Sequence, residues 1–348
     1  KLTKLTGLLL QDTLVQVWDS ATLGQLAASL RSLELINVGL FAWPSWISDC
    51  HLLYSIKLSR NTLRSIPDDA FNFVEDKLTY LDLSVTGLTQ VPKALSSLSR
   101  LETLYLSYNN LTDASQIDTI TGAPFASKLS YLYLNSAGLN RAANFSNLTI
   151  LRTLSLSNNK ISDIPAGSLP TSLTMFYFSD NSLSNVPKDV ASMYGLITLE
   201  LTNNFITNIE SNSFPSSLKY IFLDRNNLTI ITNTTFRNLG VLSTLILSSN
   251  PISVIAPGAF SDLVSIQSLR LLDSHLTEVP LAFTLLNPWT DIYWSTAQPL
   301  SCPCPTLKKL VQWYTSRTNA GDIEATCSNN QSIDAYLRGQ CLQTSATP

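Results

Sequence analysis

A short pattern of aliphatic residues recurs along nearly the whole chain, and this repeat constrains the fold more than any other feature. One copy contains Leu151, Leu154, Leu156, Asn159 and Ile161, which gives the spacing L-x-x-L-x-L-x-x-N-x-L. Twelve copies begin 22 to 28 residues apart, at Leu5, Leu30, Leu53, Leu78, Leu101, Leu129, Leu151, Leu173, Leu196, Leu218, Leu242 and Ile266, and a degenerate thirteenth begins at Trp289. Because one copy cannot bury its own aliphatic face, the copies must stack on one another.

The alternation of residues inside each copy predicts a short strand with one buried face. Leu154 and Leu156 point to the same side of such a strand, and Ser155 points to the other. Parallel strands of successive turns pair about 4.8 Å apart. Contacts between neighbouring turns, rather than one central core, should therefore supply the stability.

A polar residue recurs after the strand in most copies. This asparagine ladder comprises Asn61, Asn109, Asn159, Asn181, Asn204, Asn226 and Asn250. We expect the amide to turn inward and to satisfy backbone groups that the turn leaves unpaired. Val38 and Ala137 occupy this position in other copies and have no hydrogen-bonding side chain, so we expect irregular backbone there.

This pattern and its coverage resemble the leucine-rich-repeat family. The resemblance implies an α/β solenoid, the leucine-rich-repeat horseshoe, with a parallel concave sheet of about twelve to thirteen short strands and an irregular or 3-10 convex side. The second half of several turns ends in phenylalanine, as in Ile66 to Phe71, which resembles animal-type receptors and matrix proteins. We expect residues 1–298 to form the solenoid and residues 299–348 to form a cysteine-rich C-terminal cap.

Four of the five cysteines, Cys302, Cys304, Cys327 and Cys341, lie in the C-terminal segment. They resemble the cap of extracellular leucine-rich-repeat proteins, which implies disulfides Cys302–Cys327 and Cys304–Cys341 and an oxidising compartment. A four-thiolate zinc site is the alternative, although C-x-C is tighter than the usual C-x2-C spacing. Cys50 replaces an aliphatic residue of other turns, which favours a buried thiol and leaves an intermolecular bridge or a lost upstream partner open.

Six N-x-S/T acceptors for N-linked glycans occur, at Asn110, Asn144, Asn147, Asn227, Asn233 and Asn330. Together with the cysteine cap and only 14% charged residues, they predict an extracellular chain, either secreted or at the cell surface. None of them falls on the exposed strand positions, so the concave face would carry no glycan.

The residues between the buried leucines project from the concave face and form the candidate ligand-binding surface. Aromatic residues gather there, and tyrosine offers a large rigid contact area with a hydroxyl. The candidates are Tyr80, Glu102, Tyr105, Tyr108, Tyr131, Tyr133, Arg152, Met175, Tyr177, Glu200, Tyr220, Phe222 and Arg225. The alternative is that neighbouring rings only stack across strands and stabilise the sheet. An irregular stretch, Thr112 to Lys128, is expected to border these tyrosines, where it could contact the ligand.

Charge and composition argue against several other functions. With 22 basic and 25 acidic residues, the net charge of −3 gives no field that would attract nucleic acid. His51 and His275 lie about nine turns apart, and the sequence contains no nucleophile or phosphate-loop motif, so we expect no enzyme, no cofactor and no metal site. No apolar run is long enough to cross a membrane, so we expect membrane attachment only through a segment beyond Pro348.

These observations predict the ligand-binding ectodomain of a cell-surface receptor of the receptor-like kinase type. Its concave face would recognise a peptide, a glycan or a protein. The alternative is a secreted protein that acts as a matrix or adhesion component, or as an inhibitor of a foreign enzyme. A co-receptor, or a homodimer formed through the flanks, stays open as a further partner.

Overall fold

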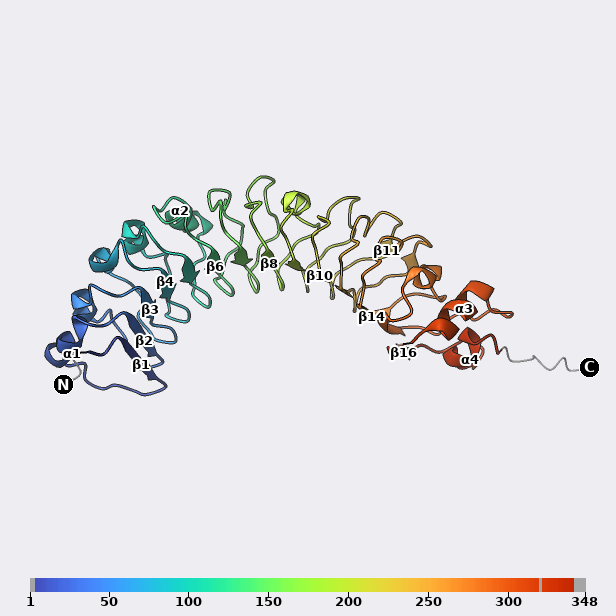
Figure 1. Cartoon of the computed structure of the whole chain (residues 1–348), viewed down its shortest axis with the longest axis horizontal. Coiled ribbons are helices and arrows are strands. Elements are labelled where there is room, and N and C mark those ends of the chain that lie inside the picture. The colour runs from blue at the N-terminus through green and yellow to red at the C-terminus, as the bar shows by residue number, and fades with distance from the viewer. Residues whose placement is uncertain (1–3, 319–320, 341–348) are drawn as a thin grey trace, which may run out of the picture. The chain divides into compact units, whose positions relative to one another are not determined.

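The computed structural model describes residues 4–318 and 321–340, which divide into two compact units, residues 1–182 and 183–348. The elements of the first unit are β1 (Gly7–Gln11), α1 (Ser20–Ala27), β2 (Ser32–Ile36), η1 (Ser45–Asp49), β3 (Ser55–Lys57), η2 (Asn72–Val74), β4 (Tyr80–Asp82), η3 (Lys93–Ser97), β5 (Thr103–Tyr105), η4 (Ala114–Ile117), α2 (Asp118–Thr121), β6 (Tyr131–Tyr133), β7 (Thr153–Ser155) and β8 (Met175–Tyr177). Each strand pairs in parallel with the next one along the chain, and the helical turns lie on the opposite side of the coil (Figure 1).

The second unit is built in the same way. Its elements are η5 (Lys188–Ser192), β9 (Thr198–Glu200), β10 (Tyr220–Phe222), β11 (Ile230–Ile231), β12 (Thr244–Ile246), β13 (Val254–Ile255), β14 (Ser268–Ser274), η6 (Leu281–Leu285), β15 (Asp291–Thr296), α3 (Lys308–Ser316), β16 (Ile323–Glu324) and α4 (Ile333–Leu337). The strand order is β9-β10-β12-β14-β15-β16, and β11 and β13 form a separate parallel pair. The expected parallel-stranded solenoid is therefore present.

The C-terminal end of the solenoid differs from the expectation in two details. The thirteenth copy, which looks degenerate in sequence, forms the regular strand β15, and Trp294 of this strand is fully buried. The C-terminal segment then adds β16, which pairs in parallel with β15. The boundary that we expect between residues 298 and 299 stays a prediction.

The aliphatic residues of the repeat fill the interior of each turn. Leu154 and Leu156, for example, are fully buried, and their counterparts on the later strands are buried as well, whereas Leu8 and Leu10 of the first turn are half-buried. Each such leucine contributes roughly 1.5 to 3 kcal/mol through burial. In the second unit, Phe214, Phe236, Phe260 and Phe283 form a second buried row on the return segments, with successive ring centroids 6.2 to 6.4 Å apart.

The asparagine ladder bonds each turn to the one before it, as expected. Asn159 is buried, and its Oδ1 accepts hydrogen bonds from the backbone N–H groups of Ala137 (3.1 Å) and Leu139 (3.0 Å). Its Nδ2 donates to the carbonyl oxygens of Leu134 (2.9 Å) and Leu156 (2.7 Å). One side chain thus satisfies four backbone groups from which water is excluded.

The expectation of irregular backbone at Val38 and Ala137 is wrong. The residue before each of them keeps the positive φ of the regular turns, 51° at Asn37 and 50° at Ser136 against 57° at Asn158. The physical reason is that the asparagine of the following turn supplies the acceptor, since Val38 N–H binds Asn61 Oδ1 and Ala137 N–H binds Asn159 Oδ1.

The C-terminal segment covers the last turn with a disulfide-bonded cap. Cys302 and Cys327 form a disulfide, so their sulfurs are not free thiolate ligands for zinc. Cys341 lies outside the described residues, and its pairing with Cys304 stays a prediction. Trp313 of α3 packs on Phe283, with ring centroids 5.7 Å apart, and so closes the end of the phenylalanine row.

Cys50 is a buried thiol, as the sequence favours. Burial, with a smaller effect of Asp49, raises the pKa of this thiol to about 12. Its side chain is fully excluded from solvent. It therefore packs as a small apolar residue.

We expect Asn159→Ala to lower the free energy of unfolding by about 3 kcal/mol, because it leaves four buried backbone groups without partners. Chemical denaturation followed by circular dichroism measures this loss. Lys160→Ala is the matched control, since the Lys160 side chain is exposed and should leave the midpoint unchanged. Equal midpoints for the two variants would contradict this role of the ladder.

Candidate functional site

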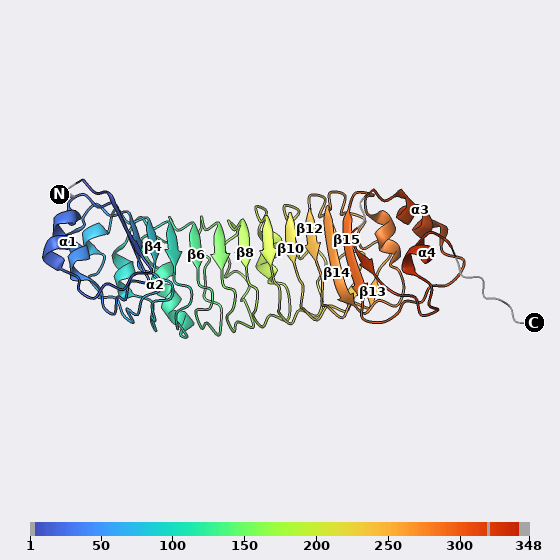
Figure 2. The ribbon, with the colours of Figure 1, turned by 90° about the horizontal axis from the view of Figure 1, so that it is seen from below.

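The candidate site is the strand face, by which we mean the side of each sheet that carries the residues between the buried leucines. Figure 2 views this side, with the strands lying next to one another. In the first unit, Tyr80 of β4, Tyr105 of β5 and Tyr133 of β6 come together there and are half-buried. The rings of Tyr105 and Tyr133 are parallel, with an interplanar angle of 1° and centroids 4.3 Å apart. Tyr80 and Tyr105 lie 5.6 Å apart at 43°. We call these three residues the tyrosine ladder.

The strand register explains this arrangement. Tyr105 is directly paired with Tyr133, whereas Tyr80 lies diagonal to Tyr105 because Asp82 occupies the paired position. Paired side chains on adjacent strands lie close enough for rings to touch, and diagonal neighbours are still within reach of aromatic side chains. Since the leucine rows fill the interior, these rings remain on the outer surface of the sheet.

The hydroxyls of the tyrosine ladder are neutral at physiological pH. Burial raises the pKa of Tyr80 to about 12, and the nearby Asp82 carboxylate adds to this effect. Burial and the adjacent Tyr105 raise the pKa of Tyr133 to about 12. The pKa of Tyr105 is also raised, first by burial and then by Tyr80. The ladder therefore offers uncharged hydroxyls that can both donate and accept hydrogen bonds.

Charged residues border the ladder on the side of the earlier strands. Lys57 Nζ lies 3.3 Å from Glu34 Oε2 and 5.8 Å from the centre of the Tyr80 ring. Lys57 is thus held between a carboxylate and an aromatic face. A ligand that lies along the ladder would meet this charged group at one end.

Two small polar residues, Thr153 and Ser155 of β7, lie on the other side of the ladder. Thr153 and Ser155 are only 1% and 3% exposed although they belong to the strand face. Their paired neighbours are larger, namely Tyr131 and Tyr133 on β6 and Met175 and Tyr177 on β8. Two small residues on β7 are therefore covered by larger residues on both neighbouring strands.

The polar groups around Thr153 and Ser155 are not all satisfied. Ser155 Oγ donates to Asn135 Oδ1 at 2.6 Å, and the Tyr177 hydroxyl donates to Met175 Sδ at 3.3 Å. Thr153 Oγ1 is buried and has no hydrogen-bond partner. Because a buried hydroxyl without a partner is destabilising, this atom marks a place where another polar group would be stabilising.

The other predicted residues of the first unit lie at the margins of this surface. Tyr131 is on the strand face and exposed, and Tyr108 is in the turn after β5 and exposed. Glu102 and Arg152 are exposed just before β5 and β7. The structure therefore brings Tyr80, Tyr105 and Tyr133 into direct contact and arranges the rest around them, while their role in ligand binding stays a prediction.

The second unit has its own strand face. Tyr220 is exposed, Glu200 and Phe222 are half-buried and directly paired, and Arg225 is exposed in the turn after β10. The sequence reasoning missed Tyr293 of β15, whose ring stacks under the Arg270 guanidinium at 4.9 Å. The repeat pattern would have placed Tyr293 on the strand face, but the pattern is hard to recognise in the copy that begins at Trp289.

The segment from Thr112 to Lys128 does not border the tyrosines, so that expectation is wrong. It forms η4 and α2, which lie beside η3 on the side away from the strands (Figure 1). Ile117, Ile120 and Phe125 are fully buried and pull this segment onto the helical side of the coil.

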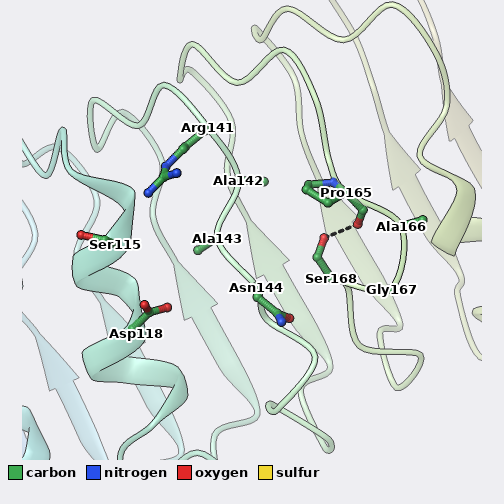
Figure 3. Close-up of a pocket in the computed structure, with 10 residues that line it drawn as sticks. All are labelled: Ser115, Asp118, Arg141, Ala142, Ala143, Asn144, Pro165, Ala166, Gly167 and Ser168. Atoms are coloured by element: carbon green, nitrogen blue, oxygen red, sulfur yellow. Dashed lines mark hydrogen bonds between the residues drawn. The ribbon is translucent and has the colours of Figure 1, made fainter.

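This same segment helps to form a polar cavity of about 310 Å³ (Figure 3). Ser115 and Asp118 form one wall, and residues 141–144 and 165–168 form the others. Asn144 lies in the wall and belongs to an N-x-S/T acceptor, so a glycan attached there would cover the cavity. This cavity is therefore a poorer candidate than the strand face.

The six acceptor asparagines of the N-x-S/T motifs lie outside the strands. All are exposed: Asn110, Asn144, Asn147, Asn227, Asn233 and Asn330. Glycans at these positions would leave the tyrosine ladder free.

Comparison with known proteins identifies the repeat. The family described as "Leucine rich repeat" matches residues 51–111 and 216–276, and a second description of the same repeat matches residues 151–171. The chain contains leucine-rich repeats. Mouse (Mus musculus) lumican is 30% identical over 152 residues, which cover 38% of this chain and 45% of lumican. The chain thus spans less than half the length of the curated lumican sequences that it matches.

Solved leucine-rich-repeat structures share the fold. An internalin from Listeria monocytogenes superimposes with a TM-score of 0.72 at 23% identity, covering 93% of this chain and 87% of the internalin. The ectodomain of a plant membrane receptor kinase from Arabidopsis thaliana, in complex with CASPARIAN STRIP INTEGRITY FACTOR 2, has a TM-score of 0.63 at 23% identity. It covers 88% of this chain and 38% of the receptor chain.

Two further observations describe this leucine-rich-repeat chain. Across residues 4–318 and 321–340, no helix is both long and apolar enough to span a bilayer. The same residues contain no group of three or more His, Cys, Asp or Glu side chains that could hold a metal ion.

We expect the tyrosine ladder to produce a late step in a spectrophotometric titration of the phenols. Tyr80 and Tyr133 should ionise near pH 12 in the native chain, and Tyr80→Phe/Tyr133→Phe should make that step smaller. The pKa of Tyr80 and of Tyr133 is higher in the folded chain than the value of about 10 in an unfolded chain. The neutral phenols of these two residues therefore stabilise the fold. This stabilisation is complete below pH 10 and is lost as the pH rises through 12. A late step of unchanged size in the double variant would contradict the assignment.

Proposed function

We propose that this chain is an extracellular recognition module whose strand face in the first unit binds a peptide, a glycan or a protein, and that it forms the ectodomain of a cell-surface receptor of the receptor-like kinase type. The observation that carries the proposal is the tyrosine ladder beside the buried Thr153 hydroxyl, which has no hydrogen-bond partner. The chain acts by binding and not by catalysis.

A peptide in an extended conformation fits this surface best. Tyr105 and Tyr133 present aromatic edges and neutral hydroxyls, to which backbone amide and carbonyl groups of a peptide can bind. The Thr153 hydroxyl, which has no partner, would gain a hydrogen bond if a polar group of the ligand took the place of a neighbouring side chain that covers it. The similar plant receptor kinase ectodomain, which is in complex with a named protein factor, supports this choice.

An extracellular location agrees with the Cys302–Cys327 disulfide, because such bonds persist in oxidising compartments. The six exposed acceptor asparagines support it further. The similarity to lumican supports an alternative, a secreted matrix or adhesion component without a membrane connection. Inhibition of a foreign enzyme is another secreted role, and a co-receptor or a second copy of the chain stays open as a partner.

The sequence that follows Pro348 in the gene distinguishes these two classes. An apolar membrane-spanning segment followed by a kinase or another signalling domain supports the receptor. A stop codon directly after Pro348 excludes the receptor and leaves the secreted protein.

We expect Tyr105→Ala/Tyr133→Ala to weaken binding at least about tenfold, a loss of 1.4 kcal/mol or more. The ligands are peptides selected on the native chain from a displayed random library, and binding is measured by calorimetry. Tyr194→Ala is the control, since Tyr194 is exposed and lies outside the strands. A large fall in melting temperature, with unchanged binding in the folded fraction, would show that the rings only stabilise the sheet.

Thr153→Val separates binding from stability at a single position. Valine keeps the shape of threonine and removes the hydroxyl that has no partner. We expect an equal or higher melting temperature and about fivefold weaker binding of the selected peptides, since one hydrogen bond contributes about 1 kcal/mol. Lower stability with unchanged affinity would contradict a role for this hydroxyl in binding.

A further inference from the structure

The first unit also carries an aromatic cavity, which is formed by other residues than those of its strand face. A cavity of about 210 Å³ is formed by the segments that precede α1 and follow β2. Its walls include Trp18, Phe41, Trp43, Pro44 and Trp46, and no residue that lines it carries a charge. The strand-face binding proposed above makes no use of this cavity.

Packed aromatic rings form the walls of this cavity. Trp18 and Trp46 are stacked, with centroids 6.4 Å apart and an interplanar angle of 21°. Trp43 packs edge-on against the buried ring of Phe71, with centroids 5.4 Å apart. These contacts hold the walls in place, so the cavity exists before any partner binds and a partner loses less entropy on binding.

Trp46, which lines the cavity, carries a hydrogen-bond donor with no acceptor. Trp46 is almost completely buried, and its indole Nε1–H has no partner. An indole nitrogen only donates hydrogen bonds, so it requires an acceptor from elsewhere. Leaving a buried donor unpaired is destabilising, and such groups are rare in folded proteins.

The surface around the cavity is strongly apolar. Phe41, Val17 and Leu14 are 80%, 80% and 78% exposed, and the first of these lines the cavity. Exposed apolar patches of this kind mark interaction sites on soluble proteins. Buried aromatic pockets surrounded by apolar contacts are also where hot spots of protein interfaces occur.

We propose that this cavity binds a peptide segment of a partner protein, which inserts one large apolar side chain between Trp18, Phe41 and Trp43 and offers a backbone carbonyl oxygen to Trp46 Nε1–H. The size fits one side chain, because 210 Å³ equals roughly seven water molecules of about 30 Å³ each. It is below the roughly 300 Å³ at which small-molecule pockets begin. A membrane surface would cover Phe41, Val17 and Leu14 but would supply no acceptor inside the recess.

The test uses NMR spectroscopy of the full chain, labelled with nitrogen-15 at its six tryptophans. The probe is N-acetyl-L-phenylalanine methylamide, which has an aromatic side chain and two amide carbonyls. Ethylbenzene is the matched probe without an acceptor. We expect the methylamide to shift the indole signal of Trp46, which is assigned by its absence in Trp46→Phe, and to bind at least fivefold more tightly than ethylbenzene.

Three variants separate the donor from the apolar walls. Trp46→Phe keeps a ring and removes the N–H, so it should weaken methylamide binding at least fivefold in the folded chain, while the smaller ring lowers the melting temperature somewhat. Phe41→Ala changes an exposed side chain and should weaken both probes. Trp313→Phe is the control, since its indole nitrogen is also buried without a partner but does not line this cavity.

Several outcomes would overturn the proposal. Equal binding of both probes, or unchanged methylamide binding in Trp46→Phe, would remove the role of the donor. A Trp46 signal that responds to phosphatidylcholine vesicles and not to the methylamide would assign the patch to a membrane surface. A signal that shifts with protein concentration alone and not with the methylamide would assign it to self-association.

Discussion

The hydrogen bonds of the buried asparagine amides hold successive turns together, and the rest of each unit depends on them. Asn159 satisfies four backbone groups of two neighbouring turns, and this lets Leu154 and Leu156 pack without exposing unpaired amides. Since the leucine rows then fill the interior, the residues between them have no space inside. Tyr105 and Tyr133 are on the surface for this reason, and not because polar groups attract them there.

The same constraint separates stability from recognition. Leucine burial and asparagine hydrogen bonds occur in every regular turn, so a substitution between the leucines changes the surface and leaves the interior intact. Thr153 shows the consequence, because a buried hydroxyl without a partner is tolerated on the strand face. A stable framework of this kind can carry groups that are unfavourable for folding and useful for binding.

The repeat pattern predicted which side of each strand is buried, because the period of two between leucines determines it. It placed Tyr80, Tyr105 and Tyr133 on one face correctly. It could not show that Tyr80 contacts Tyr105 diagonally, since this depends on side-chain conformation across two strands. It misplaced Thr112 to Lys128, because the side on which an insertion folds depends on Ile117, Ile120 and Phe125 finding the core. The Trp46 cavity was also missed, since Trp18 and Trp46 come from segments that only the fold brings together.

The central claim is that the strand face of the first unit is the surface that recognises a ligand. The most direct test is a crystal structure of the chain with a peptide selected on it. This account predicts that the peptide lies along β4 to β8, in contact with Tyr105 and Tyr133, and that one of its polar groups binds Thr153 Oγ1. A peptide seated on the helical side of the coil, with both tyrosine rings still exposed to water, would contradict it.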